Sequence, residues 1–374
     1  MDGLFALGSN GSGQLGLGHK EDVSVPKQIQ FDGEPPRDAI TQVAAGGNHT
    51  ILLTASGRAY WSGDASSGAC GIVDTSSEAG LSVFREVALS LTGPPGRIVH
   101  VACTWDASLF VVEDEHGRAT RIYTCGPADV GAVNPARGEP TLIQNEYTPA
   151  GTQVKDIAAG FRHVVVILNN GDVYGWGNGR KGQLGPKKQM DDMANPKGVV
   201  EHRRMLDGIG FKVAKAICCQ YTTCLIAEPG DGRIAVLGAD KWGLKSTAPA
   251  EVPNWMTMSA CWGSIYALQR NGILVAWGRD DHGQMPPPGL PPITHLVAGS
   301  EHVLALTEGG DVLTWGWGEH GNCGPQSEEK SGDVKGRWNV LASLKHLSEG
   351  SSITAIGAGC ATSWINIAAD GMFL

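Results

Sequence analysis

Short apolar runs separated by glycine-rich turns recur along the whole chain. In the clearest copy, residues 164–168 are apolar, residues 169–172 (Asn-Asn-Gly-Asp) signal a turn, and residues 173–177 (Val-Tyr-Gly-Trp-Gly) form a second run that ends in glycine. Runs of this kind around an Asn-Gly pair predict a β-hairpin, because the tight turn needs positive φ there. The pattern predicts short strands throughout, with one short helix inside residues 333–347.

The same phrase is repeated seven times. His163 precedes the apolar run of the clearest copy, and its position recurs every 38 to 60 residues. A repeat of this length is a supersecondary unit used many times, and units of short strands pack radially as the blades of a β-propeller. The equivalents of His163 are assigned as His49, Ala107, Thr223, Ser264, His302 and Thr362.

The two ends of the chain complement each other. The last copy stops before its closing strand and glycine, whereas the chain begins with a strand-like run, residues 2–8, and a Gly-Gln-Leu-Gly turn, residues 13–16. Joining the ends places 61 residues between Thr362 and His49, in keeping with the other copies. The sequence therefore predicts an all-β, seven-bladed β-propeller, one domain over residues 1–374, closed by the N-terminal strand completing the C-terminal blade.

Composition narrows the function classes. The formal net charge is −9, from 29 basic and 38 acidic residues, which argues against direct nucleic-acid binding. No segment has the apolar length of a membrane span, and the first residues lack a signal-peptide pattern, so we expect a cytoplasmic protein with the nucleus left open. The nine cysteines include one cluster, Cys218, Cys219 and Cys224, without a paired CxxC. Core packing is favoured over a zinc site, and no metal or cofactor is expected.

The repeated polar residues follow the symmetry of the blades. His49, His163 and His302 occupy one repeat position, as do Trp176, Trp277 and Trp315 in another, and Gln14, Gln183 and Gln284 in a third. A catalytic set needs different residues that converge on one substrate. We therefore expect each histidine to bond backbone in its own blade, the tryptophans to pack between blades, and the protein not to be an enzyme.

The Ala-Gly-x-x-His, Asp-Gly-x-Val-x-x-Trp-Gly and Gly-Gln-Leu-Gly series resembles the regulator-of-chromosome-condensation repeat, over essentially the whole chain. The resemblance implies a seven-bladed propeller with a split last blade. Family members include an exchange factor for the Ran GTPase, chromatin binders, ubiquitin-ligase modules and scaffolds, so membership alone does not fix the function.

Residues 5–22 carry a closer likeness, to the fungal alpha-tubulin-suppressor branch of this family. In that branch the propeller forms a heterodimer with a small CSL-type zinc protein. The pair supports Elongator-dependent modification of tRNA wobble uridines and diphthamide synthesis. The resemblance implies this partner, and contacts with Elongator and diphthamide enzymes through it. The alternatives are a Ran-type exchange factor, which needs a wedge such as the insertion at residues 64–95, and a chromatin binder, which the acidic charge argues against.

One repeat position predicts a binding surface. Two residues before the histidine position, blades two to five carry aromatic residues near the mouth of the central channel. Exposed aromatic residues are enriched among interface hot spots, although rings that only cover a neighbouring strand end would show the same pattern. The insertion at residues 326–352 is predicted to be a lid or a surface loop. The predicted partner-binding residues are Trp105, Phe161, Tyr221 and Trp262, with Trp242, Trp255, Trp317 and Trp338 as further aromatic residues outside the repeat grid.

Overall fold

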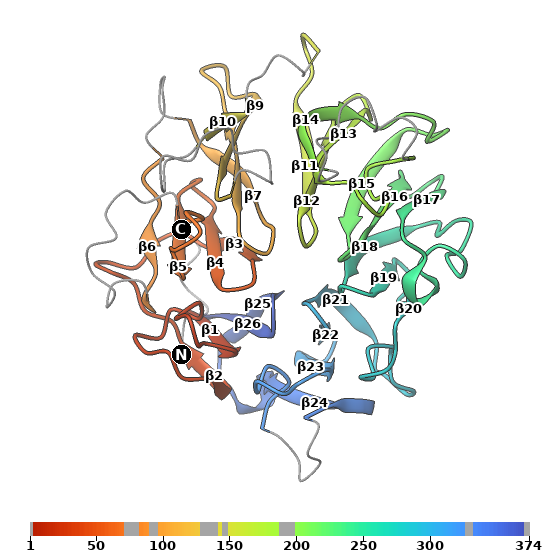
Figure 1. The fold of residues 1–374 in the computed structure, drawn as a ribbon. Helices are drawn as coiled ribbons and strands as arrows, with labels where there is room; N and C mark the ends of the chain where they lie inside the picture. Colours follow the sequence, from red (N-terminus) through yellow and green to blue (C-terminus); the bar gives the residue numbers. More distant parts are fainter. Residues whose placement is uncertain are drawn as a thin grey trace.

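Seven small antiparallel sheets surround a central axis as the blades of a propeller (Figure 1). The computed structural model describes residues 3–70, 82–89, 96–127, 141–143, 149–186, 199–325 and 332–369. Five of the described sheets have four strands and two have three. The predicted all-β, seven-bladed architecture is confirmed. No helix in these ranges is long and apolar enough to cross a membrane.

Each blade runs from an inner strand at the axis to an outer strand at the rim. Blade 1 contains β3 (Ile40–Ala45), β4 (His49–Thr54), β5 (Ala59–Gly63) and β6 (Arg85–Glu86), and blade 2 contains β7 (Ile98–Cys103), β8 (Ser108–Glu113), β9 (Ala119–Cys125) and β10 (Thr141–Ile143). Blade 3 contains β11 (Val154–Ala159), β12 (His163–Leu168), β13 (Val173–Asn178) and β14 (Val199–Met205), and blade 4 contains β15 (Val213–Cys218), β16 (Thr222–Ala227) and β17 (Ile234–Gly238). Blade 5 contains β18 (Trp255–Ala260), β19 (Ser264–Gln269) and β20 (Leu274–Gly278), and blade 6 contains β21 (Ile293–Ala298), β22 (His302–Thr307), β23 (Asp311–Gly316) and β24 (Val334–Ser343). Blade 7 contains β25 (Ser351–Ala358), β26 (Thr362–Ala369), β1 (Gly3–Gly8) and β2 (Val23–Gln28).

The N-terminal strand closes the ring. Strand β1 lies between β26 and β2, and its pairing with β26 runs without a break from Gly3 opposite Ile367 to Gly8 opposite Thr362. Asp22, just before β2, also reaches blade 6, where its Oδ2 is 2.7 Å from Nδ1 of His320. The first and last strands of the chain are therefore one sheet, as predicted.

The apolar core is divided among the spaces between blades. Trp176, Trp277 and Trp315 each pack in a cluster that combines residues of two adjacent blades, as predicted. The Trp277 indole also donates across the space to the carbonyl of Leu244 at 3.0 Å, and the Trp315 indole donates to that of Gln284 at 3.0 Å. These tryptophans thus bury apolar surface between two blades, and the hydrogen bond of Trp277 fixes the position of one blade relative to the next.

The repeated histidines join neighbouring blades. Nε2 of buried His163 is 2.9 Å from the Thr223 hydroxyl on blade 4, and that hydroxyl donates to the carbonyl of Gln183 at 2.8 Å. Because the hydroxyl proton is used on Gln183, Nε2 of His163 must carry a proton. Burial lowers the pKa of His163 to about 4, which keeps the ring neutral near pH 7. His302 makes the equivalent contact with Ser363 at 3.0 Å. The expectation of a backbone bond within the same blade is therefore wrong for His163 and His302.

The repeat position in blade 4 is Thr222, one residue before the assigned Thr223. Thr222 pairs with Gly238 as His163 pairs with Gly177. The turn before it confirms this alignment, since the Cys219 amide donates to the Thr222 carbonyl at 2.8 Å. Two consecutive threonines conceal this one-residue difference in the sequence.

The two insertions contribute outer strands. In the first, Phe84 is fully buried beside Trp364, and β6 pairs with β5, whereas residues 71–81 and 90–95 lie outside the described residues. In the second, β24 pairs with β23, and the 3-10 helix η5 (Leu344–His346) follows it. The predicted short helix within residues 333–347 is present as the single 3-10 turn η5, whereas the preceding residues of that range form β24, because pairing with β23 overrides local preference. The described part of the second insertion, residues 332–352, is blade structure and not a lid; residues 326–331 lie outside the described residues.

Candidate protein-binding site

The turns between the inner and second strands of all seven blades meet at one end of the channel. Each turn is closed by a backbone bond from the residue three before the histidine position, such as Gly160 N to His163 O at 2.9 Å. Neighbouring turns are also bonded to one another: Trp105 N donates to Phe161 O at 2.9 Å, and Trp262 N donates to Ser300 O at 2.8 Å. Hydrogen bonds within and between turns therefore fix the backbone that carries these side chains.

Small residues leave room inside this ring of turns. A cavity of about 140 Å³ lies on the axis, lined by the inner-strand ends of the blades. Glycines there have no space for a side chain: a Cβ atom on Gly160 would lie 2.4 Å from His163 and 2.6 Å from the Cys219 carbonyl. Close approach of seven turns requires glycine or another small residue at these positions.

Three of the four predicted aromatic residues form one cluster at this mouth. The ring centroids of Trp105 and Phe161 are 5.2 Å apart, those of Trp105 and Trp262 are 5.7 Å apart, and those of Phe161 and Trp262 are 5.8 Å apart. All three side chains line the axial cavity and are half-buried. The rings of blades 2, 3 and 5 thus converge across the channel and leave partly exposed apolar faces. We call these three residues the aromatic cap.

Tyr221 does not join the aromatic cap. Because the repeat position of blade 4 is Thr222, the residue that matches Trp105 and Phe161 is Gln220. Gln220 takes the expected place in the ring of turns, where its amide donates to the Trp262 carbonyl at 3.0 Å. Tyr221 is half-buried one residue further on, and it makes no ring contact with the cap in the described part of the chain.

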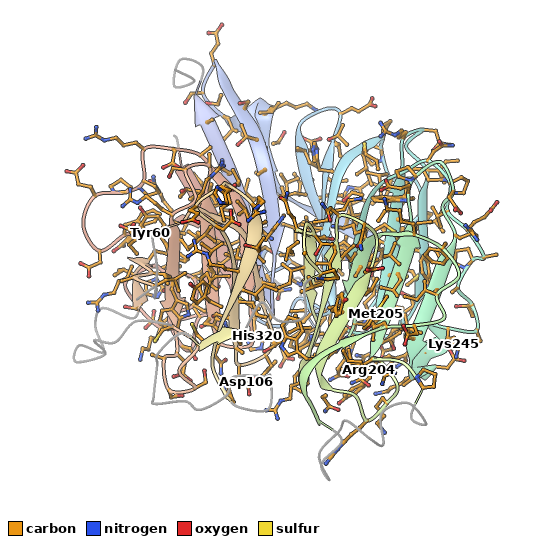
Figure 2. All side chains as sticks on the ribbon, turned by 90° about the horizontal axis from the view of Figure 1, so that it is seen from above. Tyr60, Asp106, Arg204, Met205, Lys245 and His320 are labelled. Atoms are coloured by element: carbon orange, nitrogen blue, oxygen red, sulfur yellow. The ribbon has the colours of Figure 1, made fainter. Side chains whose placement is uncertain are left out.

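Charged residues flank the cap on the side of blades 2 and 3. An Arg162 nitrogen lies 3.0 Å from Asp106 Oδ2, and the guanidinium carbon lies 5.8 Å from the Phe161 ring centre. The edge-on view places Asp106, Lys245 and His320 toward the same face of the disc (Figure 2). A partly exposed ion pair of this kind contributes little to stability.

Trp242 extends the aromatic surface toward blade 5. It lies in the 3-10 turn η4 (Lys241–Gly243) with φ 61°, a left-handed conformation that is unusual for a bulky residue. Lys241 Nζ is 3.9 Å and Arg279 Cζ 4.9 Å from the ring centre, and a Cβ atom on Gly263 would lie 2.8 Å from the indole. Cation–π contacts and a neighbouring glycine thus hold this ring in place. Sequence placed Trp242 outside the repeat but gave no sign of its position beside Gly263.

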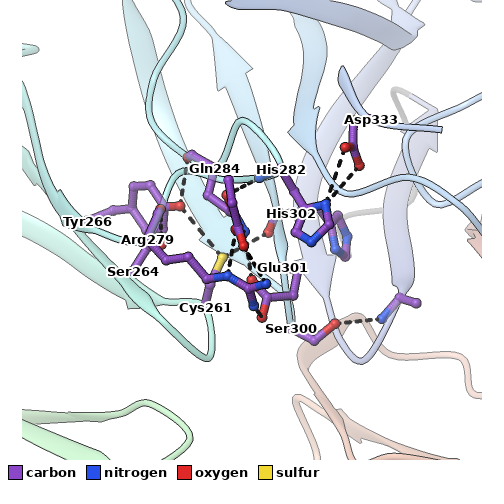
Figure 3. Close-up of polar contacts among 12 residues, drawn as sticks. Cys261, Ser264, Tyr266, Arg279, His282, Gln284, Ser300, Glu301, His302 and Asp333 are labelled. Carbon is purple, nitrogen blue, oxygen red and sulfur yellow. Dashed lines mark hydrogen bonds and ion pairs between the residues drawn. The ribbon is translucent and has the colours of Figure 1, made fainter. Parts of the chain in front are cut away.

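Arg279, which lies against Trp242, belongs to a largely buried polar network with Gln284 and Glu301 (Figure 3). The Glu301 carboxylate, almost fully buried, accepts from Arg279 at 2.5 Å and from the Gln284 amide at 2.8 Å. Arg279 also donates to Asp281 at 2.7 Å. Burial raises the pKa of Glu301, while the Gln284 and Arg279 contacts oppose that rise. The network thus holds the Arg279 guanidinium, whose Cζ lies 4.9 Å from the centre of the Trp242 ring.

Six of the nine cysteines are buried in the core, and three are half-buried at the axis. Cys103, Cys218 and Cys360 line the axial cavity, and burial raises the pKa of the Cys218 thiol to about 12 and that of Cys360 to about 11. Thiols in this state are protonated and poor metal ligands. No group of three or more metal-ligating side chains occurs within the described ranges.

The fold and the repeated turn define a seven-bladed propeller of the regulator-of-chromosome-condensation type. The family model for the RCC1-like domain matches residues 3–365, and the chain belongs to this family. It is 30% identical to the RCC1 repeat-containing protein C10F6.04 of Schizosaccharomyces pombe, over 97% of this chain and 98% of that protein.

Two further relatives show how widely the fold is used. The mouse secretion-regulating guanine nucleotide exchange factor is 27% identical over 75% of this chain, which spans 61% of that protein. Prp20p of Saccharomyces cerevisiae, studied for its binding to Gsp1p and histones, has a TM-score of 0.77 at 19% identity and covers 98% of this chain and 92% of its own. At that identity the likeness establishes the fold alone.

Proposed function

We propose that this propeller is a non-catalytic protein-binding module that uses the aromatic cap and Trp242 as its main contact surface. The observation that carries the proposal is the convergence of Trp105, Phe161 and Trp262, half-buried, on a hydrogen-bonded ring of turns. Aromatic residues on a rigid support lose little conformational entropy on binding and are frequent hot spots. The repeated histidines are meanwhile occupied within the fold.

The proposed partner is a small CSL-type zinc protein. Support comes from the likeness of residues 5–22 to the alpha-tubulin-suppressor, or killer-toxin-insensitivity, branch of the family. The metal of the pair would belong to the partner, since the thiols of this chain that line the channel are half-buried and their raised pKa keeps them protonated. In this proposal the heterodimer supports Elongator-dependent wobble-uridine modification and diphthamide synthesis, in the cytoplasm with access to the nucleus.

The surface suits a compact partner with an apolar patch and a few charges. The cap provides flat ring faces, and Arg162, Asp106 and Lys241 surround it with both signs of charge. Apolar contact at the centre with polar groups at the rim is the usual arrangement of a specific interface. Placing the contact over the channel mouth would also cover the axial cavity.

The test is calorimetric titration of the purified zinc protein into the full chain and into single alanine variants. We expect one-to-one binding that Trp105→Ala, Phe161→Ala or Trp262→Ala weakens by about 2 kcal/mol or more. Tyr221→Ala should have a smaller effect, because Tyr221 lies outside the cap. Trp255→Ala is the matched control: this half-buried indole starts β18 and bonds the Ala227 carbonyl.

The outcomes separate the partner from the site. Absence of binding to the zinc protein by the unaltered chain would reject the partner. Unchanged affinity in all three cap variants, each folded by thermal melting, would reject the cap. Accelerated nucleotide release from a Ran-type GTPase, or salt-sensitive binding to nucleosomes, would instead support the alternative functions of an exchange factor or a chromatin binder.

A further inference from the structure

Blade 5 has an outer edge that lacks the strand found in most other blades. Its sheet ends at β20, whereas the sheets of blades 1, 2, 3, 6 and 7 continue to a fourth strand. Only Trp277 of β20 is buried, while every residue of the corresponding strand β5 in blade 1 is buried. Part of β20 is therefore open to solvent where its counterpart is covered.

The hydrogen-bonding groups on this edge can be assigned from the pairing with β19. Two inward bonds flank the strand, Gln269 N to Ile273 O at 2.9 Å and Arg279 N to Gly263 O at 2.8 Å. Antiparallel strands alternate inward and outward groups along the backbone. The amides and carbonyls of Leu274, Ala276 and Gly278 consequently point away from β19, toward the rim.

Other blades show what occupies this position. The residue four before the strand-ending glycine is Leu274 in blade 5, Ala59 in blade 1, Val173 in blade 3 and Leu4 in blade 7. In these three other blades its carbonyl accepts a backbone amide from the chain that forms the outer edge, at 2.8, 2.8 and 3.1 Å. Within the described residues no backbone donor bonds the carbonyl of Leu274.

The connection that follows β20 is unsuited to fill the gap. Residues 285–292 read Met-Pro-Pro-Pro-Gly-Leu-Pro-Pro, and proline has no amide proton to donate. Blade 4 also has three strands, but its outer edge is partly paired. The amide of Ile234 in β17 donates to the Ala250 carbonyl at 3.1 Å. The open edge is thus a property of blade 5.

We propose that the rim edge of β20 binds an extended peptide segment of a partner protein by strand addition. The segment would run antiparallel to β20, as β24 does to β23, and bond the outward groups of Leu274, Ala276 and Gly278. Unpaired strand edges are templates for this kind of recognition. The site lies at the rim of blade 5, apart from the aromatic cap, and does not depend on the function proposed for the cap.

A labelled peptide of residues 334–343, the sequence of β24, provides the probe. In blade 6 this sequence pairs with β23, the strand that corresponds to β20 of blade 5. Val312 of β23 occupies the same repeat position as Leu274 of β20. We expect one-to-one binding to the full chain by fluorescence anisotropy, with slower hydrogen exchange at the amides of Ala276 and Gly278. Failure to bind at millimolar peptide would overturn the proposal.

Proline variants locate the binding edge. Ala276→Pro removes one outward amide and leaves the inward bonds to β19, so we expect about tenfold weaker binding and an unchanged fold by thermal melting. Val236→Pro removes the corresponding outward amide of β17 in blade 4 and should leave affinity unchanged. Equal effects of the two substitutions would contradict the assignment to β20.

Chemically altered peptides test the same point without changing the protein. N-methylation of alternate amides along one edge of the peptide should abolish binding, and methylation along the other edge should not. Equal loss with both peptides, or no loss with either, would contradict strand addition. Binding of the zinc protein to Ala276→Pro should be unchanged, which separates this site from the aromatic cap.

Discussion

At the scale of single residues, the buried histidines make stability dependent on pH. Burial lowers the pKa of His49, His163 and His302 to about 4 in each case, from 6.5. Because the folded pKa is below the unfolded value, the unfolded chain binds more protons between these values, and stability falls as pH decreases from about 6.5 toward 4. We expect a loss of about 2 kcal/mol per histidine at pH 5 relative to pH 8. Urea unfolding at pH 5 and at pH 8 measures this loss in the free energy of unfolding.

His163→Gln provides the control at this scale, since its amide can still donate to Thr223. The variant should lose about a third of the pH dependence, and an unaltered dependence would contradict the assigned role. Sequence predicted that these histidines are structural, because they recur by symmetry. It could not predict their partners, because Thr223 and Ser363 belong to neighbouring blades and their distance depends on how blades pack.

At the scale of an element, the turn that carries the aromatic cap depends on glycine. A Cβ atom on Gly160 would overlap the His163 ring and the backbone of blade 4, which cannot move independently. We expect Gly160→Ala to reduce the free energy of unfolding by about 2 kcal/mol. Gly11→Ala is the matched control, because a Cβ there meets nothing within 4 Å, and it should be close to neutral. Equal unfolding midpoints for both variants in urea would contradict this account.

The sequence predicted the second and third strands of each blade best, because their apolar runs and the glycines of their turns mark both ends of each strand. Within residues 333–347 it predicted the short helix, found as η5, but not the strand β24 before it, which is formed by pairing with β23 and not by local preference. The site shows the same limit. Trp105, Phe161 and Trp262 were correctly placed by repeat position, whereas the two threonines of blade 4 brought Tyr221 into the set by a shift of one residue. The contacts of Trp242 depend on an irregular turn without a repeat signal.

At the scale of the whole molecule, closure of the ring depends on β1. Its six residues pair with β26 on one side, and β2 packs on the other, while Leu4, Ala6 and Leu15 are buried between blades 7 and 1. Removing residues 1–16 would expose one edge of β26, detach β2 from its sheet and uncover Phe84 and Trp364. Residues 1–16 also hold buried Phe5 and Leu7, and loss of the four large side chains, Leu4, Phe5, Leu7 and Leu15, costs on the order of 2 kcal/mol each before the lost backbone pairing is counted.

We therefore expect the chain without residues 1–16 to melt well below the full protein and to aggregate through its open strand edge. Thermal melting and size-exclusion chromatography measure these two effects. Adding a synthetic peptide of residues 1–16 should restore part of the melting temperature, because β1 binds its neighbours by backbone pairing and buried side chains that a peptide also provides. A truncated chain that melted like the full protein would show that β1 is dispensable for closure, despite its continuous pairing with β26.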